Sequence, residues 1–132
     1  MWHSPLLALS LLASSLLATE VFAETDAGTT GKIKSAIADE RRPDADRARD
    51  KNRKPLETLQ FLGLKEDMRV LELMPGGGWY TRLLAPVLND NGQLYLSIFA
   101  ERAANALEGQ SGFENMSLIP FDRARISRPE GS

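Results

Sequence analysis

The chain has 132 residues, a formal net charge of -2 and no cysteine. This length holds at most one domain, and the near-neutral charge gives no broad basic field for binding nucleic acid. The absence of cysteine excludes disulfides and thiolate metal sites, and with His3 as the only histidine no metal site is expected.

Residues 1–23 are typical of an export signal. The apolar stretch Leu6–Ala18 is too short to span a bilayer comfortably, and Val21 and Ala23 provide small residues for cleavage before Glu24. The segment before this stretch has neither Lys nor Arg, so an uncleaved interfacial or anchoring helix is the alternative. Cleavage predicts an exported protein, periplasmic or secreted, with no stable membrane insertion.

The next segments predict a leader and then a helix. Residues 24–31 are rich in Thr, Gly, Asp and Ala, which predicts a flexible leader before a domain at 32–132. Ile33 and Ile37 lie at helical spacing, so a short helix is expected to end before Pro43.

The charged segment 43–55, PDADRARDKNRKP, has two alanines as its apolar residues apart from the flanking prolines. Asp44 suits a helix cap, and Asp50 lies three residues before Arg53, a spacing that supports a helix. A helix with almost no apolar face does not stabilise itself. The spacing alone therefore favours a solvated charged linker over a segment that covers a polar cleft.

The segment after it is a clearer helix. Pro55 fits a first helical turn, Leu56, Leu59 and Leu62 lie along one side, and Gly63 suits the position just past the end. That leucine stripe is expected to be core.

Strands and helices alternate in the rest of the chain. The predicted order is strand 68–73, helix 79–88, strand 93–99, helix 101–108, strand 115–121 and a polar tail from 122 to 132. Pro86 predicts a bend or an early end in the first of these helices. The nearly continuous apolar run at 93–99 is typical of a strand covered on both faces. The alternation predicts an α/β fold with a parallel sheet and right-handed crossovers.

Three adjacent glycines directly follow the first strand, in VLELMPGGGWYT at 70–81. A strand, a glycine turn and a helix form a corner where a ligand can approach the backbone closely. A phosphate-binding P-loop is excluded because no Gly-Lys follows. A dinucleotide site is disfavoured, because Thr81 replaces the third glycine of that pattern and Trp79 puts bulk against the pyrophosphate path.

A third ligand that uses such corners is S-adenosylmethionine, which has a carboxylate, an ammonium group and an adenosine but no phosphate. Glu72 is placed to meet the ammonium group at the end of the strand. Pro75, Gly76 and Gly78 suit a backbone that approaches the methionyl part.

Three pieces of the sequence, between about Ile37 and Asp122, resemble the class I S-adenosylmethionine-dependent methyltransferases. They are most similar to a bacterial group of predicted exported methyltransferases, and they read AIADERRPDADRARDKNRKPLETLQFLGL, VLELMPGGGWYTRLLAP and NGQLYLS. The first carries an R-P-x-x-D-x-x-R-D-x-x-R-x-P run, and the second an E-x-x-P-G-G-G-W-Y-T motif that is far more specific than a lone G-x-G. The resemblance implies a Rossmann-like parallel sheet, incomplete and preceded by N-terminal helices.

The resemblance also implies site residues. The cofactor-binding set is Glu72, Pro75, Gly76, Gly77, Gly78, Trp79, Tyr80 and Glu101. The residues of the charged run that match the group, and so are expected at the cleft, are Asp46, Arg49, Asp50 and Arg53. Arg53 either binds a carboxylate or pairs with Asp50, and Trp79 and Tyr80 either wall the pocket or pack their helix on the sheet. No catalytic residue is assigned.

Two positions depart from the family pattern. Met74 stands where the family has a glycine two residues after the acid. The acid that binds the ribose is expected near Ile98, and the nearest one is Glu101, about three residues late. Glu101 either reaches the ribose or only begins the next helix, where an acid is favourable in any case.

The resemblance covers strands 1 to 3 of a seven-stranded sheet with the spatial order 3-2-1-4-5-7-6. Strand 68–73 is therefore expected to be an apolar edge with unpaired backbone groups, which favours self-association. Three explanations stay open: a fragment of a longer protein, a truncated gene product, or a half-domain completed by a partner.

Two functions follow from the sequence. The first is an S-adenosylmethionine-dependent methyltransferase acting on a small-molecule substrate. The alternative is a non-catalytic exported protein that uses the glycine corner for another small ligand, because S-adenosylmethionine is a cytoplasmic metabolite. No stripe of basic and aromatic residues indicates nucleic-acid binding.

Overall fold

A computed structural model describes residues 25–121, so the predicted signal at 1–23 and the predicted tail at 122–132 lie outside the described residues. The described part is α/β, with five helices and a three-stranded parallel sheet. Its elements in chain order are α1 (Ala27–Ala38), α2 (Asp44–Arg53), α3 (Pro55–Phe61), β1 (Arg69–Leu73), α4 (Thr81–Leu88), β2 (Gln93–Ser97), α5 (Glu101–Leu107) and β3 (Met116–Ile119). This order confirms the predicted alternation of strands and helices.

The sheet has the order β1-β2-β3, with both neighbouring pairs parallel. Val70 lies opposite Leu94, which in turn lies opposite Met116. Within the described residues β1 is an edge strand, as the sequence predicts.

One face of the sheet is covered and the other is open among the described residues. Leu94 and Leu96 point to the covered face and are 0% exposed, whereas Leu71 and Leu73 on the opposite face of β1 are 52% and 54% exposed. Because α4 packs on β2 and α5 on β3, these two helices form the covering layer. The prediction that 93–99 is covered on both faces is confirmed only in part among the described residues. On the second face Ser97 is buried, Gln93 and Tyr95 are intermediate, and Phe99 is 74% exposed.

The N-terminal helix begins earlier than the sequence indicates. Asp26 caps α1 by accepting hydrogen bonds from the backbone N and the hydroxyl of Thr29, both at 2.8 Å. The pKa of Asp26 is lowered, chiefly by the backbone bond. Thr29 is completely buried and its Oγ1 accepts from the backbone N of Glu66 at 3.1 Å. The prediction of a flexible leader over 24–31 is thus wrong from Ala27 onward, because a side-chain cap and a buried threonine fix this turn.

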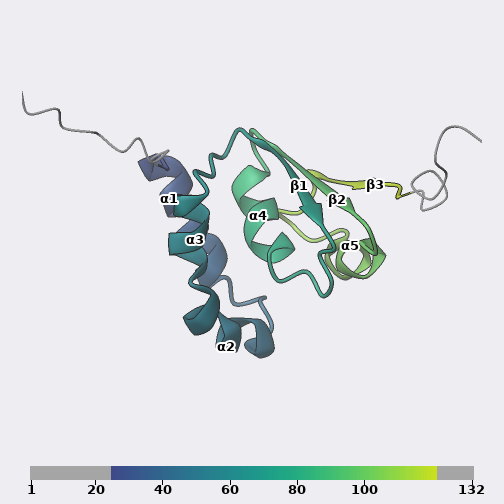
Figure 1. The fold of residues 1–132 in the computed structure, drawn as a ribbon, viewed down its shortest axis with the longest axis horizontal. Helices are drawn as coiled ribbons and strands as arrows, with labels where there is room; N and C mark the ends of the chain where they lie inside the picture. The colour runs from purple at the N-terminus through teal and green to yellow at the C-terminus, as the bar shows by residue number, and fades with distance from the viewer. Residues whose placement is uncertain (1–24, 122–132) are drawn as a thin grey trace, which may run out of the picture.

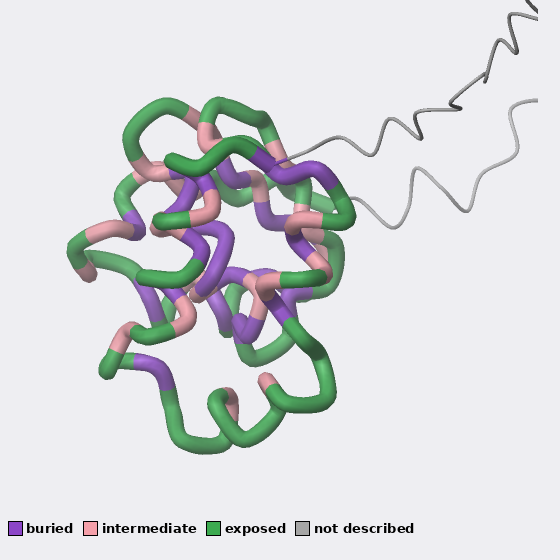
Figure 2. The backbone as a smooth tube through the Cα atoms, turned by 90° about the vertical axis from the view of Figure 1, so that its left-hand side faces the viewer, coloured by how far each residue is buried: buried purple, intermediate pink, exposed green. Residues whose placement is uncertain are grey.

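The core lies between α1, α3, α4 and the covered face of the sheet. Figure 1 shows α1 and α3 side by side, with α4 between them and the strands. Ile33, Leu59, Leu83 and Leu88 meet there, and Figure 2 shows the buried segments gathered inside an exposed outline. At the turn between α4 and β2, a Cβ on Gly92 would lie 2.6 Å from a backbone carbonyl oxygen, so only glycine fits.

The charged segment forms helix α2, so the solvated linker that spacing favours is wrong. Helix α2 has no buried residue, and Asp44 is its first residue, not its cap, since Pro43 occupies the N-cap position. Burial of an apolar face does not hold this helix in place. Its polar contacts hold it, and they lead directly to the candidate site. No helix within residues 25–121 is long and apolar enough to cross a membrane.

Candidate functional site

A cavity of about 780 Å³ runs along β1 to its carboxyl end, between the glycine turn, α2 and α3. This volume is in the range of small-molecule sites, about 300–1,000 Å³. Its lining joins the predicted motif to the charged helix and to an apolar wall: Asp46, Arg49, Arg53, Leu59, Leu62, Leu64, Met68, Val70, Leu71, Glu72, Leu73, Met74, Pro75, Gly76, Gly77, Trp79, Tyr80 and Leu84.

The glycine turn is open toward this cavity. Gly76 has φ +58 and Gly78 has φ +84, values that side chains rarely adopt. A Cβ built on Gly76 or Gly77 would meet nothing within 4 Å, so both backbones are free for close approach. Gly78 differs, because it is buried and its Cβ would lie 3.3 Å from Cβ of Ala103. Gly78 is therefore a packing residue beneath the turn, while Gly76 and Gly77 line the cavity.

Glu72 provides a partly desolvated carboxylate on the cavity wall. It is half-buried, and the hydroxyl of the completely buried Thr81 donates to its Oε2 at 2.7 Å. Burial raises the pKa of the Glu72 carboxyl above its usual value of 4.5, and hydrogen bonds from Thr81 offset only part of that rise. A neighbouring cation would stabilise the ionised form.

Trp79 and Tyr80 fulfil both roles that the sequence left open. Both line the cavity, and Trp79 is also part of the core at 4% exposure. Their rings meet edge to face, with centroids 4.6 Å apart. The indole Nε1 donates to the backbone carbonyl of Asp46 at 2.9 Å, so Trp79 connects the turn to α2.

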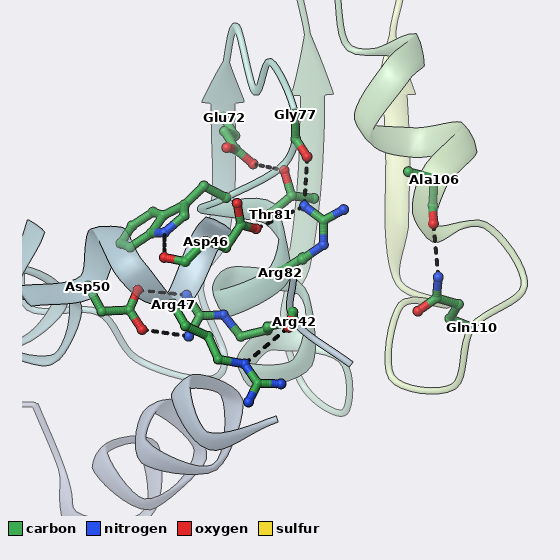
Figure 3. A network of polar contacts seen from close by, with 11 residues as sticks. Arg42, Asp46, Arg47, Asp50, Glu72, Gly77, Thr81, Arg82, Ala106 and Gln110 are labelled. Atoms are coloured by element: carbon green, nitrogen blue, oxygen red, sulfur yellow. Dashed lines mark hydrogen bonds and ion pairs between the residues drawn. The ribbon is translucent and has the colours of Figure 1, made fainter. Parts of the chain in front are cut away.

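Two ion pairs hold α2 against the rest of the molecule (Figure 3). Arg42 makes a two-pronged pair with Asp50, with its Nη1 and Nη2 at 2.7 Å and 2.8 Å from the carboxylate oxygens. Arg82, on the first turn of α4, places Nη1 at 3.2 Å from Asp46 Oδ2 and at 2.6 Å from the Gly77 carbonyl. Arg82 thus links α2 to the glycine turn.

The arginines of α2 that face the cavity are placed differently. The Arg53 guanidinium lies 4.7 Å from the centre of the Trp79 ring. Arg49 lines the cavity and makes no ion pair or hydrogen bond within residues 25–121. Of the two alternatives left open for Arg53, pairing with Asp50 is not observed, because the Asp50 carboxylate pairs with Arg42.

Three predicted site residues are absent from the cavity lining: Gly78, which packs beneath the turn, Asp50 and Glu101. Asp50 points to Arg42 and is absent from the lining. Glu101 is exposed at the first turn of α5 and borders a separate hollow of about 340 Å³ with Ile98 and Phe99. The structure therefore gathers Asp46, Arg49, Arg53, Glu72, Pro75, Gly76, Gly77, Trp79 and Tyr80, and leaves Asp50, Gly78 and Glu101 outside the lining.

The backbone is strained where the strands end. Met74 after β1, and Ile98 and Phe99 after β2, have φ of 53, 56 and 56. A β-branched residue such as Ile98 is an outlier at positive φ. Residues in sparsely populated backbone conformations cluster at functional sites, so this strain marks the carboxyl edge of the sheet.

Sequence reasoning missed three residues that organise the site: Arg42, Thr81 and Arg82. Thr81 stands in place of the third glycine of the dinucleotide pattern and ends the E-x-x-P-G-G-G-W-Y-T motif, and its buried hydroxyl donates to Glu72. Arg42 begins the R-P-x-x-D run but was given no role, and Arg82 belongs to no motif. Their partners are 8 and 36 residues away, and charges at such separations have no periodicity.

Comparison with known proteins identifies no relative: no protein-family model, curated protein or solved structure matches this chain. Within residues 25–121, no group of three or more His, Cys, Asp or Glu side chains is placed to hold a metal ion. The residues of the cavity therefore carry the functional argument by themselves.

Proposed function

We propose that this chain is the cofactor-binding part of an S-adenosylmethionine-dependent methyltransferase with a Rossmann-like sheet. The observation that carries the proposal is the meeting of a desolvated carboxylate, Glu72, with two open glycines, Gly76 and Gly77, on one cavity at the carboxyl end of a parallel strand. Ligands of open α/β sheets bind outside the carboxyl ends of the strands.

The cavity residues suit the parts of such a cofactor. The Glu72 carboxylate would pair with the ammonium group of the cofactor. This pairing would offset the free-energy cost of burying a carboxylate whose hydrogen-bond donor, the Thr81 hydroxyl, is neutral. Gly76 and Gly77 would let the methionyl part approach the backbone. Trp79 and Tyr80 would wall the adenosine or the acceptor. The bound cofactor supplies an activated methyl group, and the task of the protein is to position the reactants.

Glu101 has a weaker place in this proposal. It borders a separate hollow, so it would meet the ribose only if the ligand extends past the end of β2. The chemistry of the cavity therefore rests on Glu72 and the turn.

Export remains part of the proposal, with a periplasmic or secreted methyltransferase as the expected form. A non-catalytic exported protein that binds a different small ligand is the competing function, and a binding measurement separates the two.

Calorimetric titration of S-adenosylhomocysteine into the full chain tests the proposal. Gly77→Val adds bulk beside the cavity without clash, because Gly77 has no positive φ and open space around it. We expect this variant to unfold at the same temperature as the parent but to bind S-adenosylhomocysteine at least about tenfold more weakly, a loss of about 1.4 kcal/mol. Gly31→Val, also in open space but on α1, is the matched control. Absence of binding to the parent chain, or equal affinity in Gly77→Val, refutes the proposal.

A further inference from the structure

One face of α2 carries both acidic and basic side chains, and only the acidic ones form ion pairs with the rest of the described chain. Asp46, Arg49, Asp50 and Arg53 have the spacing i, i+3, i+4 and i+7, so their side chains share one side of the helix. The two acids of this face are paired with arginines from elsewhere in the chain, and the two arginines of this face are not paired with acids.

The paired acids are well protected from solvent. The side chains of Arg82 and Asp46 are 13% and 14% exposed, and those of Arg42 and Asp50 are 2% and 20% exposed. Each acid is neutralised by a partner outside α2. Neither one therefore neutralises Arg49 or Arg53.

The two arginines line the cavity with unused donors. Arg53 lies against the Trp79 ring, a contact that uses the charge of a guanidinium but none of its five N–H donors. Within residues 25–121, the guanidinium group of neither Arg49 nor Arg53 donates to a carbonyl, a hydroxyl or a carboxylate. By contrast, Arg47 on the same helix donates to the carbonyls of Arg42 and Glu40, and it is absent from the lining.

An apolar wall adjoins this pair. Leu59, Leu62, Leu64 and Met68, from α3 and the segment that follows it, line the same cavity. Since α3 starts directly after Lys54, the wall continues from Arg53 along the chain. A ligand anchored at the arginines would lay its body on these side chains.

The net charge of the cavity lining favours a ligand that carries one negative charge. Asp46 is balanced by Arg82, which leaves Glu72 against Arg49 and Arg53 and one positive charge in excess. A monocarboxylate balances this excess, and guanidinium groups match the planar geometry of a carboxylate.

We propose that Arg49 and Arg53 form an anion subsite that binds the carboxylate of an apolar organic acid, and that such acids are the class of methyl acceptor. The acceptor role rests on the proposed function above, whereas the anion subsite stands without it. The apolar body of the acid lies against the apolar wall, and the cation–ring contact with Trp79 holds Arg53 in position.

Titration of octanoate into the full chain tests the subsite, with octanol as the uncharged probe of the same length. A hydrogen bond to a charged group contributes about 1.5–3 kcal/mol, so we expect Arg49→Gln and Arg53→Gln each to weaken octanoate binding about tenfold or more. Arg53→Lys keeps the charge but loses the planar, two-pronged donor geometry of the guanidinium. Its octanoate affinity should therefore lie between those of the parent and Arg53→Gln. Octanol affinity should not change in any variant.

Lys51→Gln is the matched control, because it removes the same charge from an exposed position of α2 outside the cavity. Arg49→Gln guards against loss of fold, since the Arg49 side chain makes no ion pair or hydrogen bond within the described residues that its removal would break. Unchanged octanoate affinity in both arginine variants, or an equal loss in Lys51→Gln, overturns the subsite.

Titration of S-adenosylhomocysteine into the same variants separates the subsite from the proposed function. We expect its affinity to be unchanged by Arg49→Gln and Arg53→Gln. An equal loss for S-adenosylhomocysteine and octanoate would assign the arginines to the carboxylate of the cofactor and overturn the acceptor assignment. Arginine-dependent octanoate binding in a chain that fails to bind S-adenosylhomocysteine supports the subsite and refutes only the methyltransferase proposal.

Discussion

Helices α2 and α4 both border the cavity, but different forces hold them. Six of the eight residues of α4 are buried, and Leu83, Val87 and Leu88 have no exposed surface. Helix α2 has no buried residue and is held by two ion pairs, an indole hydrogen bond and cation–ring contacts. One wall of the cavity is thus fixed by burial of apolar surface, and the other by directional contacts that single substitutions can release.

The largest effect is expected in α4. Leu83→Ala should lower the free energy of unfolding by about 2–5 kcal/mol, because it leaves a cavity at a completely buried position. Urea denaturation followed by circular dichroism measures this loss. The control is Leu118→Ala, at a position that is 52% exposed, where a change of about 0.5 kcal/mol or less is expected. Equal losses in the two variants would show that α4 is not the core element described above.

The glycine turn lies between the two helices and is expected to give an intermediate effect. Gly78→Ala should cost about 1–2 kcal/mol, because the new side chain must adopt φ +84 and lies 3.3 Å from Cβ of Ala103. Gly77→Ala, one residue earlier, should change the free energy of unfolding by less than about 0.5 kcal/mol. A turn in which both substitutions cost the same would contradict the different roles of these neighbours.

A smaller and local effect is expected in α2. Asp46→Asn keeps the shape of the side chain but removes the negative charge that pairs with Arg82, a loss of about 1 kcal/mol. Hydrogen exchange should become faster over residues 44–53 while α4 stays protected. Faster exchange in both helices would mean that α2 is coupled to the core, contrary to the contrast between them.

The smallest stability effect is expected at Glu72, and it depends on pH. Because burial raises the pKa of this carboxyl in the folded chain, folding binds extra protons between the usual value of 4.5 and the raised one. Stability conferred by the protonated form is therefore lost as pH rises through that window. Glu72→Gln should be slightly more stable than the parent at pH 7, and the difference should shrink below pH 4.5.

Thermal melts of both chains across this pH range measure the difference. The same substitution should weaken binding of S-adenosylhomocysteine, since the ammonium group loses its partner. A variant less stable than the parent at pH 7 would show that the ionised carboxylate is favourably paired in the free protein.

The same contrast explains how much the sequence could predict. Apolar periodicity reports burial, so the helix that ends at Leu88, the burial of Leu59 and the order of strands were predicted correctly. The predicted leucine stripe is wrong at Leu62, which follows the end of α3 and is 67% exposed. Pro86 lies inside α4, which continues to Leu88 despite the lost hydrogen bond. The position of α2 could not be predicted, because it depends on Arg42 and Arg82, whose partners are set only when the chain has folded.

The candidate site divides in the same way. The glycine motif located Glu72, Gly76 and Gly77 because local backbone geometry dictates them. Glu101 does not join them, because it is exposed at the first turn of α5 and borders a separate hollow past the end of β2.

The most direct test is hydrogen exchange of the full chain with and without S-adenosylhomocysteine. The ligand is proposed to lie between α2 and the glycine turn, so exchange should slow over residues 44–53 and 76–80 and stay unchanged over 101–119. No slowing in either segment, or slowing confined to 101–119, would contradict the site proposed at the carboxyl end of β1.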